Sequence, residues 1–322
     1  MAAADDICLV TGGAGFIGSH LVDGLLGQGR RVVVLDDLST GREANLPAGV
    51  DLHGLDIRSR EAAELVRDLR PRYLFHQAAQ MDVRRSTEDP VFDAGVNILG
   101  TLNLLQAAVE AGVRQVVFAS TGGAIYGEQE TFPASEEHPT RPVSPYGVSK
   151  LAGERYLYYF HVAHGLDVTC LRYANVYGER QNPHGEAGVV AIFIERLLAG
   201  KPCVINGDGL QTRDYIHVSD AVAANLATLG RAGFRVYNVG TGVETSVVQL
   251  HRWLAEATGR EPSPVHGPAK SGEQRRSAVD ARRLAHELSW PAPLVLVDGL
   301  RRTVDGFRAG AGGQTAPRPA QE

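Results

Sequence analysis

Cysteine is rare in this sequence, and its three copies do not group. Cys8, Cys170 and Cys203 lie in separate apolar runs, and their spacing is not that of a metal site. His161 and His164 share a helical spacing but lack a companion acid, so they also predict no metal. We therefore expect buried free thiols in a reducing compartment, which favours the cytoplasm.

Long apolar runs and a strong net charge are also missing. No stretch reaches the roughly 20 apolar residues that a membrane span needs, and Asp5 and Asp6 stand where a leader would be basic. The formal net charge of −5 gives no reason to expect nucleic acid or an anionic membrane as a partner. Hydrophobic residues make up 43% and charged residues 21% of the 322 positions, which is typical of a globular protein with an ample core.

A glycine-rich turn follows the first apolar run of the chain. Residues 7–10 lead into glycines at 12, 15 and 18 and then into a helical pattern. Glycine suits a tight turn where a pyrophosphate approaches the amides of a helix N-terminus. A second apolar run, 31–35, ends at Asp36, where an acid suits the two ribose hydroxyls of NAD and repels the 2′-phosphate of NADP. This pattern predicts an NAD site that includes Gly12, Gly15, Phe16, Ile17 and Asp36.

Apolar runs and helical patterns alternate through the first half of the chain. Further runs lie near 50–56, 73–76, 116–120 and 167–172, with helical patterns near 59–70, 90–112 and 146–164. The alternation predicts an α/β fold of the Rossmann type, a doubly wound parallel sheet. Ligands of such sheets bind at the carboxyl ends of the strands, so the loops after the strands should carry the chemistry.

Beyond about residue 175 the pattern loosens. A helix is expected at 188–199, between short apolar pieces, and we interpret this half as a smaller α/β substrate lobe interleaved with the sheet. The last residues are rich in glycine, alanine and proline, which predicts a disordered tail. The expected division is an NAD-binding domain at 1–175 with return segments at about 212–240, a nucleotide-sugar-binding lobe at 176–211 and 241–308, and a tail at 309–322.

Tyr146 and Lys150 stand four residues apart at the start of a predicted helix. Ser144 suits its N-cap and Pro145 its first position. Residues i and i+4 share a helix face, so the ammonium should lie one turn from the phenol. A neighbouring cation favours phenolate, and Lys150 is expected to lower the pKa of Tyr146 toward the working pH. With an NAD site upstream, the pair predicts a tyrosine base in a nicotinamide-dependent reaction.

With these motifs the chain resembles the extended short-chain dehydrogenase/reductase family and, within it, the UDP-sugar 4-epimerases. The resemblance runs from Thr11 to about Leu300. Besides the glycine turn, Asp36 and the Tyr146–Lys150 pair, it rests on further motifs at 56–57, 76–79, 97, 120–121, 172–178 and 207–220.

The resemblance implies a tightly bound NAD and assigns residues to it. Asp56 and Ile57 resemble the adenine contacts, and Lys150 resembles the residue that binds the nicotinamide ribose. The strand-end loop under the cofactor and its neighbours would be Ala78, Ala79, Gln80 and Asn97, with Tyr146 at the nicotinamide.

A UDP-sugar substrate is implied in the same way. Asn175 resembles the residue that holds the diphosphate or the sugar, and Val189 is a further expected substrate contact. Arg213 resembles the arginine that pairs with the diphosphate, a role that suits a planar guanidinium. The alternative for Arg213 is a surface salt bridge with Asp208 or Asp214.

A late motif departs from the family pattern. Lys270 stands where a diphosphate arginine is expected, and Arg275 or Arg276 are candidates to compensate for it. Ser277 falls where some members carry a bulky tyrosine beside the C2 substituent of the sugar. A small residue there would leave room for an N-acetyl group.

The catalytic hydroxyl departs from the pattern as well. The family places a serine or threonine four residues before the tyrosine at 126, but that position is Gly122. Thr121 is therefore the first candidate and Ser120 the second, to hydrogen-bond the sugar O4 and relay its proton to Tyr146.

The expected reaction inverts C4 of UDP-glucose or UDP-galactose through a transient 4-keto sugar. Gly122 and Gly123 replace the acidic residues with which related dehydratases and decarboxylases continue from the same oxidation. UDP-N-acetylglucosamine and UDP-glucuronate stay open as substrates of a 4-epimerase. The resemblance also implies a homodimer, paired through the helices near 97–112 and 146–164.

Overall fold

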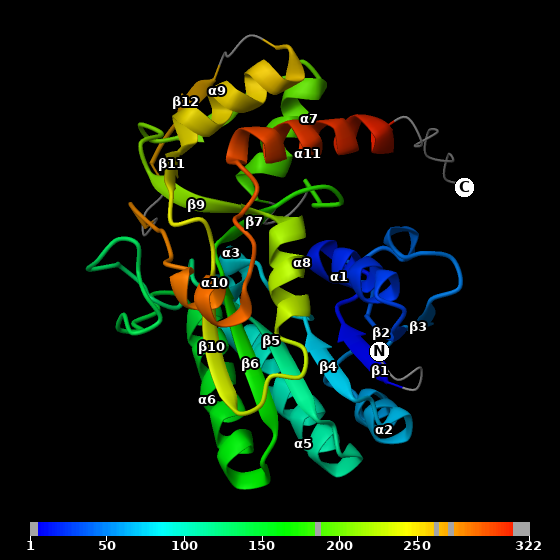
Figure 1. The fold of residues 1–322 in the computed structure, drawn as a ribbon. Helices are drawn as coiled ribbons and strands as arrows, with labels where there is room; N and C mark the ends of the chain where they lie inside the picture. Colours follow the sequence, from blue (N-terminus) through cyan, green and yellow to red (C-terminus); the bar gives the residue numbers. More distant parts are fainter. Residues whose placement is uncertain (1–5, 184–187, 261–263, 270–273, 312–322) are drawn as a thin grey trace.

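The computed structural model of the protein describes residues 6–183, 188–260, 264–269 and 274–311. In this part of the chain, seven parallel strands form one central sheet in the order β10-β6-β5-β4-β1-β2-β3. Figure 1 shows the sheet below a group of helices. The strands are β1 (Ile7–Thr11), β2 (Arg31–Leu35), β3 (Asp51–His53), β4 (Tyr73–His76), β5 (Gln115–Thr121), β6 (Asp167–Tyr173) and β10 (Phe234–Val239).

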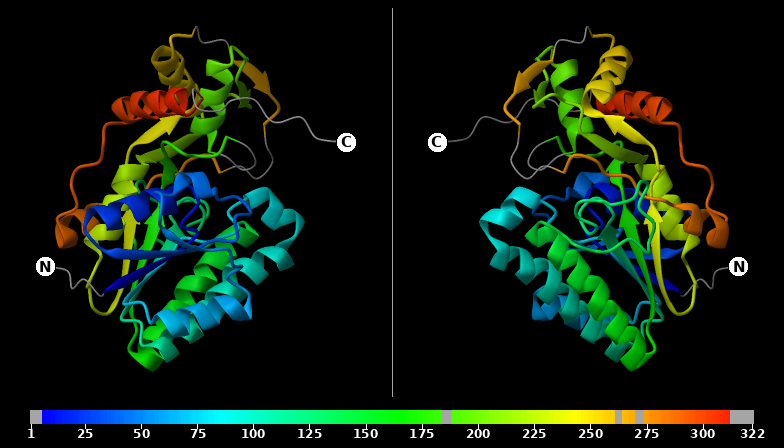
Figure 2. Two further views of the ribbon diagram at one scale, coloured as in Figure 1. Left: turned by 90° about the vertical axis from the view of Figure 1, so that its right-hand side faces the viewer. Right: turned by 90° about the vertical axis from the view of Figure 1, so that its left-hand side faces the viewer.

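Helices cover both faces of this sheet (Figure 2). Alternate strand residues supply the two cores: Cys8 and Val10 pack on one face, whereas Leu9 belongs to the other. Each such apolar side chain contributes about 1.5–3 kcal/mol on burial. One face is covered by α1 (Phe16–Gly27), α8 (Val218–Ala227) and α10 (Arg282–Leu288), the other by α2 (Arg60–Leu69), α5 (Thr101–Ala111) and α6 (Pro145–His164). The predicted doubly wound α/β fold is confirmed.

The predicted helix at 90–112 is not continuous. It consists of α4 (Pro90–Ala94), a π-helical segment at Gly95–Gly100, and α5. Glycines at both ends of the π segment weaken regular helix there, and Gly100 also lets the chain pass Ile57, since a Cβ would lie 2.7 Å from its side chain. Before it stand α3 (Val83–Glu88) and the 3₁₀ turn η1 (Glu43–Asn45).

The smaller lobe lies at the carboxyl edge of the central sheet, because β6 ends at Tyr173 and the chain enters the lobe at Asn175. Its helices share one apolar core that includes Ile194, Leu254 and Leu300. The helices are α7 (Val189–Leu198), α9 (Val247–Thr258) and α11 (Leu296–Ala311). They cover a sheet of β7 (Asn175–Tyr177), β9 (Thr212–His217) and β11 (Glu244–Ser246), next to the pair β8 (Val204–Asn206) and β12 (Val265–Gly267).

We predicted that the segment at about 212–240 returns to the NAD-binding domain. In the structure this segment is divided between the central sheet and the smaller lobe. Strand β9 pairs with β7 and β11 in the smaller lobe, whereas α8 and β10 join the central sheet. The domain boundaries themselves stay a prediction. At the end of the chain α11 runs to Ala311, so residues 309–311 of the predicted tail are helical, and 312–322 lie outside the described residues.

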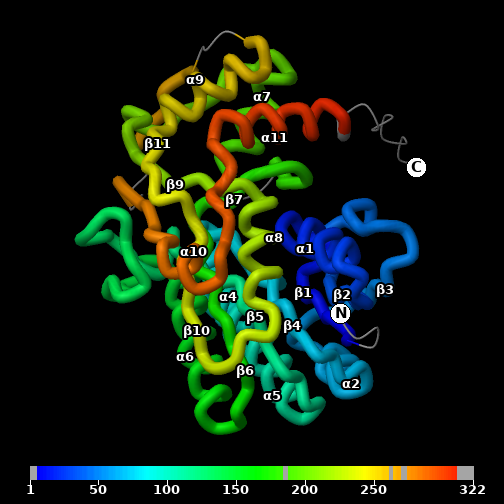
Figure 3. Tube along the Cα trace, in the orientation of Figure 1, coloured from blue at the N-terminus to red at the C-terminus, as the bar shows by residue number. Residues whose placement is uncertain are grey.

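The long loop after β5 packs against the smaller lobe (Figure 3). Ala134 donates its amide to Ala278 O at 2.9 Å and accepts from the Asp280 amide at 2.8 Å. The loop thereby fixes residues 278–280 beside the carboxyl end of β5. In the described residues no helix is long and apolar enough to cross a membrane.

Candidate active site

The glycine turn joins β1 to α1 at the carboxyl edge of the sheet. Gly12 has φ +67°, and a Cβ there would lie 2.6 Å from Ala78 N. A Cβ on Gly18 would lie 2.0 Å from Gly12 O, so the turn closes only without side chains. Gly15 occupies the N-cap of α1, where it has no side chain to cover the first amides. Phe16 and Ile17 follow and are half-buried.

Asp36 lies at the end of β2, beside this turn. Its carboxylate accepts hydrogen bonds from Ala14 N and Leu38 N, both at 2.9 Å. Burial raises its pKa above the ordinary value, against the effect of those bonds. Gly41 leaves the carboxylate room, since a Cβ there would lie 2.7 Å from Asp36 Oδ1.

Hydrogen bonds with Thr11 and Asn97 hold the loop after β4. The Ala78 amide donates to Thr11 Oγ1 at 3.3 Å, and Ala79 and Gln80 follow it. Asn97 accepts from the Gln80 amide at 3.0 Å and donates to Gln80 O at 2.8 Å. The buried Asn97 side chain therefore contributes to the predicted cofactor site by fixing this loop.

Asp56 and Ile57 come after β3 with different surroundings. Asp56 pairs with Arg58 at 2.5 Å, and hydrogen bonds from Arg58 lower the pKa of its carboxyl. The Ile57 side chain is buried in the core, and its carbonyl accepts from Asn103 Nδ2 at 2.8 Å. An adenine contact of Ile57 would therefore involve its main chain.

Helix α6 begins as the sequence predicts and carries the tyrosine–lysine pair. The Ser144 side chain caps it by accepting from Gly147 N, and Pro145 is its first residue. Lys150 is 3% exposed and donates to Ala119 O at 2.9 Å. Its Nζ lies 6.0 Å from the centre of the half-buried Tyr146 ring.

The electrostatics of this pair differ from the prediction. Burial raises the pKa of Tyr146, and the charge of Asp93 adds to the rise. Burial also lowers the pKa of Lys150 to about 8. The chain by itself thus raises the tyrosine pKa, and lowering it requires a positive charge from outside the chain.

The two candidate hydroxyls at the end of β5 have separate surroundings. Ser120 is buried and donates to Glu154 Oε1 at 2.6 Å, in a network with Arg172. Thr121 is half-exposed, and its Oγ1 accepts from Ala124 N at 3.2 Å. Thr121 is therefore the more accessible of the two residues, whereas the Ser120 hydroxyl is buried in its bond with Glu154.

Asn175 lies beside this strand end at the entry to the smaller lobe. A Cβ on Gly123 would lie 3.3 Å from Asn175 Oδ1 and 3.8 Å from Thr121 Oγ1, so the two side chains flank the same glycine. The structure brings Thr121 and Asn175 together at one point of the sheet edge. Val189 begins α7 and packs on the core of the smaller lobe.

The basic candidates of the smaller lobe surround β9. Arg213 donates to Thr212 O at 2.8 Å. Arg275 holds Asp208 with two hydrogen bonds of 2.9 Å, and Arg276 pairs with Glu244 at 2.5 Å. A diphosphate would therefore compete with carboxylates for Arg275 and Arg276. Lys270 lies outside the described residues.

Ser277 is buried beside β9. Its amide donates to Thr212 O at 3.2 Å, and its carbonyl accepts from Asp214 N at 2.9 Å. Asp214 in turn accepts from Thr241 and Gly242, at 2.6 to 3.1 Å. The position of Ser277 is therefore fixed by backbone pairing.

Two buried acids near the site were not predicted. Asp93 on α4 accepts from Gln80, Asn97 and Ser149. Glu154 on α6 pairs with Arg172 at 2.6 Å. Spacing was the available signal: Asp93 precedes Asn97 by four residues, and Glu154 follows Lys150 by four.

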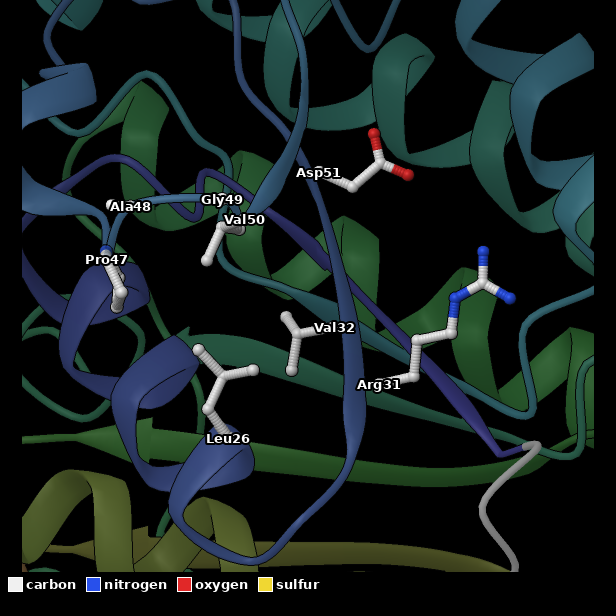
Figure 4. Close-up of a pocket in the computed structure, with 8 residues that line it drawn as sticks. All are labelled: Leu26, Arg31, Val32, Pro47, Ala48, Gly49, Val50 and Asp51. Atoms are coloured by element: carbon white, nitrogen blue, oxygen red, sulfur yellow. The ribbon is translucent and has the colours of Figure 1, made fainter.

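An open hollow on the surface lies elsewhere. Figure 4 shows its lining, which includes Arg31 at the start of β2 and Asp51 at the start of β3. It is thus at the amino edge of the sheet, away from the predicted site residues. No group of three metal-binding side chains occurs within the described ranges.

Comparisons with known proteins agree with this geometry. The model of the NAD dependent epimerase/dehydratase family matches residues 8–240. UDP-glucose 4-epimerase of Mycolicibacterium smegmatis is 48% identical over 93% of this chain and 98% of its own.

Two solved structures have the same fold over their whole length. UDP-glucose 4-epimerase of Thermotoga maritima, determined with UDP-glucose, superposes with a TM-score of 0.93 at 46% identity, over 95% of this chain and 99% of that one. The UDP-glucose 4-epimerase of Thermus thermophilus, in complex with NAD, gives a TM-score of 0.90 at 46% identity, over 94% of this chain and 99% of that one.

Proposed function

The chain belongs to the NAD-dependent epimerase/dehydratase family, and from this premise we propose that it is a UDP-glucose 4-epimerase. Such an isomerase inverts C4 of a UDP-hexose through a transient 4-keto sugar. The observation that carries the proposal is the bond of Lys150, one helical turn from Tyr146, to Ala119 O on β5, the strand that ends at Thr121. Strand β1, which leads into the glycine turn, belongs to the same parallel sheet.

The residues present fit NAD. Gly12 and Gly18 form a turn that a single Cβ would fill, at the uncovered N-terminus of α1. Asp36 offers a carboxylate for the ribose hydroxyls, and Asn97 holds Gln80 in the loop at 78–80 with two hydrogen bonds. The chemistry that NAD supplies when bound is reversible hydride exchange at C4 of the sugar.

The proton moves through the side chains of this chain. Tyr146 takes the O4 proton, directly or through Thr121, and gives it back when C4 is reduced on the other face. Because burial raises the pKa of Tyr146, ionisation of the phenol would depend on the positive charge of the oxidised cofactor when it is bound. Asn175, Val189 and Arg213 would hold the UDP-sugar, so that the 4-keto sugar stays bound while it turns.

A 4,6-dehydratase is the second candidate, since it begins with the same oxidation. Elimination needs an acid and a base beside Thr121, where this chain has Gly122 and Gly123. A Cβ on Gly122 would lie 2.7 Å from Val279 Cγ1, so the backbone is packed against the smaller lobe there. These glycines favour the epimerase.

The small residue Ser277 supports a wider choice of sugar. Its position beside the C2 substituent rests on the family resemblance, and its side chain is short enough to leave room for an N-acetyl group. UDP-N-acetylglucosamine is therefore the alternative substrate, with UDP-glucuronate as a further one.

We also infer a homodimer in the cytoplasm. Tyr158, Tyr159 and Val162 on α6 are more than half exposed, which leaves an apolar stripe suited to a second copy of the helix. Cys8, Cys170 and Cys203 are free and buried, which agrees with a reducing compartment.

The test is turnover of the purified protein without added cofactor. UDP-glucose, UDP-N-acetylglucosamine and UDP-glucuronate are incubated separately, and the products are identified by proton NMR. We expect the C4 epimer of UDP-glucose. A 4-keto-6-deoxy product would replace the proposal by the dehydratase, and no turnover of any substrate would refute it.

A matched variant, Tyr146→Phe, keeps the ring and removes the proton-carrying oxygen. It should retain NAD and lose a factor of about 10²–10⁴ in kcat. Retained activity would exclude Tyr146 as the acid–base group.

A further inference from the structure

Lys150 is an ammonium group in an unfavourable place. It is 3% exposed, lies 4.8 Å from the centre of the Phe118 ring, and donates to the carbonyl of Ala119. Among the described residues no carboxylate lies within ion-pair distance of it. A buried charge is costly in free energy unless an anion is close. The charge of Lys150 therefore depends on the groups that surround it.

Asp93 is the buried anion on the facing helix. It is 0% exposed and accepts from Ser149 Oγ at 2.6 Å, and Ser149 directly precedes Lys150. Its other oxygen accepts from Gln80 Nε2 and Asn97 Nδ2, both at 3.0 Å. All three donors are neutral, so they fix the carboxylate without cancelling its charge.

We propose that Asp93 is a positioning residue that keeps Lys150 protonated at neutral pH, with Ser149 holding the carboxylate against α6. The proposal rests on the proposed function, since it concerns the lysine beside the proposed catalytic tyrosine. The same carboxylate accepts hydrogen bonds from Gln80 and Asn97. Asp93 would thus both fix the predicted cofactor loop and stabilise the charge of Lys150.

The other ionisable groups around Lys150 do not take this role. On β4, His76 is buried between Thr11 and Thr101, and burial lowers its pKa to about 3, so it is neutral. Glu154, one turn further along α6, is neutralised by Arg172. In the chain without its cofactor, burial raises the pKa of Tyr146, so its phenol carries no charge at neutral pH.

The charge of Asp93 raises the pKa of both Lys150 and Tyr146. Burial lowers the pKa of Lys150 and the charge of Asp93 opposes this, whereas burial and Asp93 together raise the pKa of Tyr146. Removing the charge should therefore lower both values. The bell-shaped pH profile of turnover should move as a whole toward lower pH, which loss of packing would not produce.

Asp93→Asn is suited to the test because it removes the charge and keeps the shape. The amide oxygen can accept from Gln80 and Asn97, and the amide nitrogen can donate to the Ser149 hydroxyl. Asp89→Asn is the matched control: it removes the same charge from the exposed N-cap of α4, a position that asparagine caps equally well.

Because the chain has few lysines, the titration of Lys150 can be measured directly. The chain has lysine only at 150, 201 and 270. Holoenzyme labelled with ¹³C-lysine should thus give three side-chain titrations by NMR, with Lys150 assigned by its loss in Lys150→Met. We expect a Lys150 midpoint in Asp93→Asn that is about one pH unit below that of the wild type, with no change in Asp89→Asn.

An unchanged Lys150 midpoint in Asp93→Asn would overturn the proposal. So would a wild-type Lys150 that is already neutral at pH 7, a result that needs no variant to fold. The titration does not depend on turnover. A lowered midpoint in a protein that fails to epimerise any UDP-sugar would leave the role of Asp93 standing and remove the proposed function.

Discussion

Replacing Glu154 by glutamine should remove a negative charge from the interior without changing the shape of the side chain. Glu154 and Arg172 are 4% and 5% exposed, and they share two hydrogen bonds, Nε–Oε1 at 2.9 Å and Nη2–Oε2 at 2.6 Å. Burial disfavours the charge of Arg172, yet its pKa is raised because the bonds and charge of Glu154 outweigh that cost. The pair is therefore mutually dependent.

The expected loss of stability follows from the charge of Arg172, which remains in the variant. In Glu154→Gln the guanidinium remains buried with no anion beside it, and breaking a buried pair in this way costs about 3–5 kcal/mol in the free energy of unfolding. Ser120 still finds an acceptor in the amide oxygen, so its hydroxyl adds little to the loss. The double variant Glu154→Leu with Arg172→Met should recover part of it, because no charge is left unpaired.

The assay is urea unfolding followed by circular dichroism, with NAD at the same saturating concentration in every sample because a bound ligand adds to stability. Glu256→Gln on the exposed face of α9 is the control, expected within about 0.5 kcal/mol of the wild type. If Glu154→Gln lost less than about 1 kcal/mol, the argument from the buried charge would be wrong.

Three further outcomes are expected. Gly18→Ala puts a Cβ 2.0 Å from Gly12 O and should abolish NAD retention after gel filtration. The control Gly27→Ala, with open space around its Cβ, should keep NAD and raise the free energy of unfolding by about 0.5–1 kcal/mol. Equal NAD content in both variants would contradict the role of the glycine turn in binding NAD. Burial raises the pKa of Asp36, so its carboxylate should take up a proton, and NAD should be released, as the pH falls but still above the ordinary aspartate value of 3.8; release only below that value would count against Asp36. Val162→Asp on the exposed face of α6 should convert a dimer to a monomer in light scattering, and an unchanged mass would rule out this face as the interface.

Much of the fold follows from local pattern. Short apolar runs predicted the strands near 7–10, 31–35, 73–76 and 167–172, since parallel strands that are buried on both faces have no polar side. Ser144 and Pro145 predicted the start of α6 because capping is a local effect. The helix at 90–112 was only partly right, because the π segment depends on the packing of Gly100 against Ile57 from a distant loop.

The candidate site likewise has features that the sequence predicted and features that only the structure shows. Residue type and spacing predicted the glycine turn, Asp36 and the Tyr146–Lys150 pair as site residues, and these roles stay predictions. The sequence ranked Thr121 before Ser120 as the catalytic hydroxyl but could not show their different surroundings. They differ because one hydroxyl of the strand end points at Glu154 and its neighbour does not.

The sequence by itself determined which groups are present: a glycine turn predicted to hold a dinucleotide, an acid predicted to bind its ribose, and a tyrosine one helical turn from a lysine. Only the tertiary structure decided the charges around that pair. Asp93 lies 57 positions before Lys150 in the chain and reaches α6 through Ser149, and burial then raises the pKa of Tyr146 instead of lowering it. Desolvation and long-range charge depend on which segments pack together, and local spacing carries no information about either.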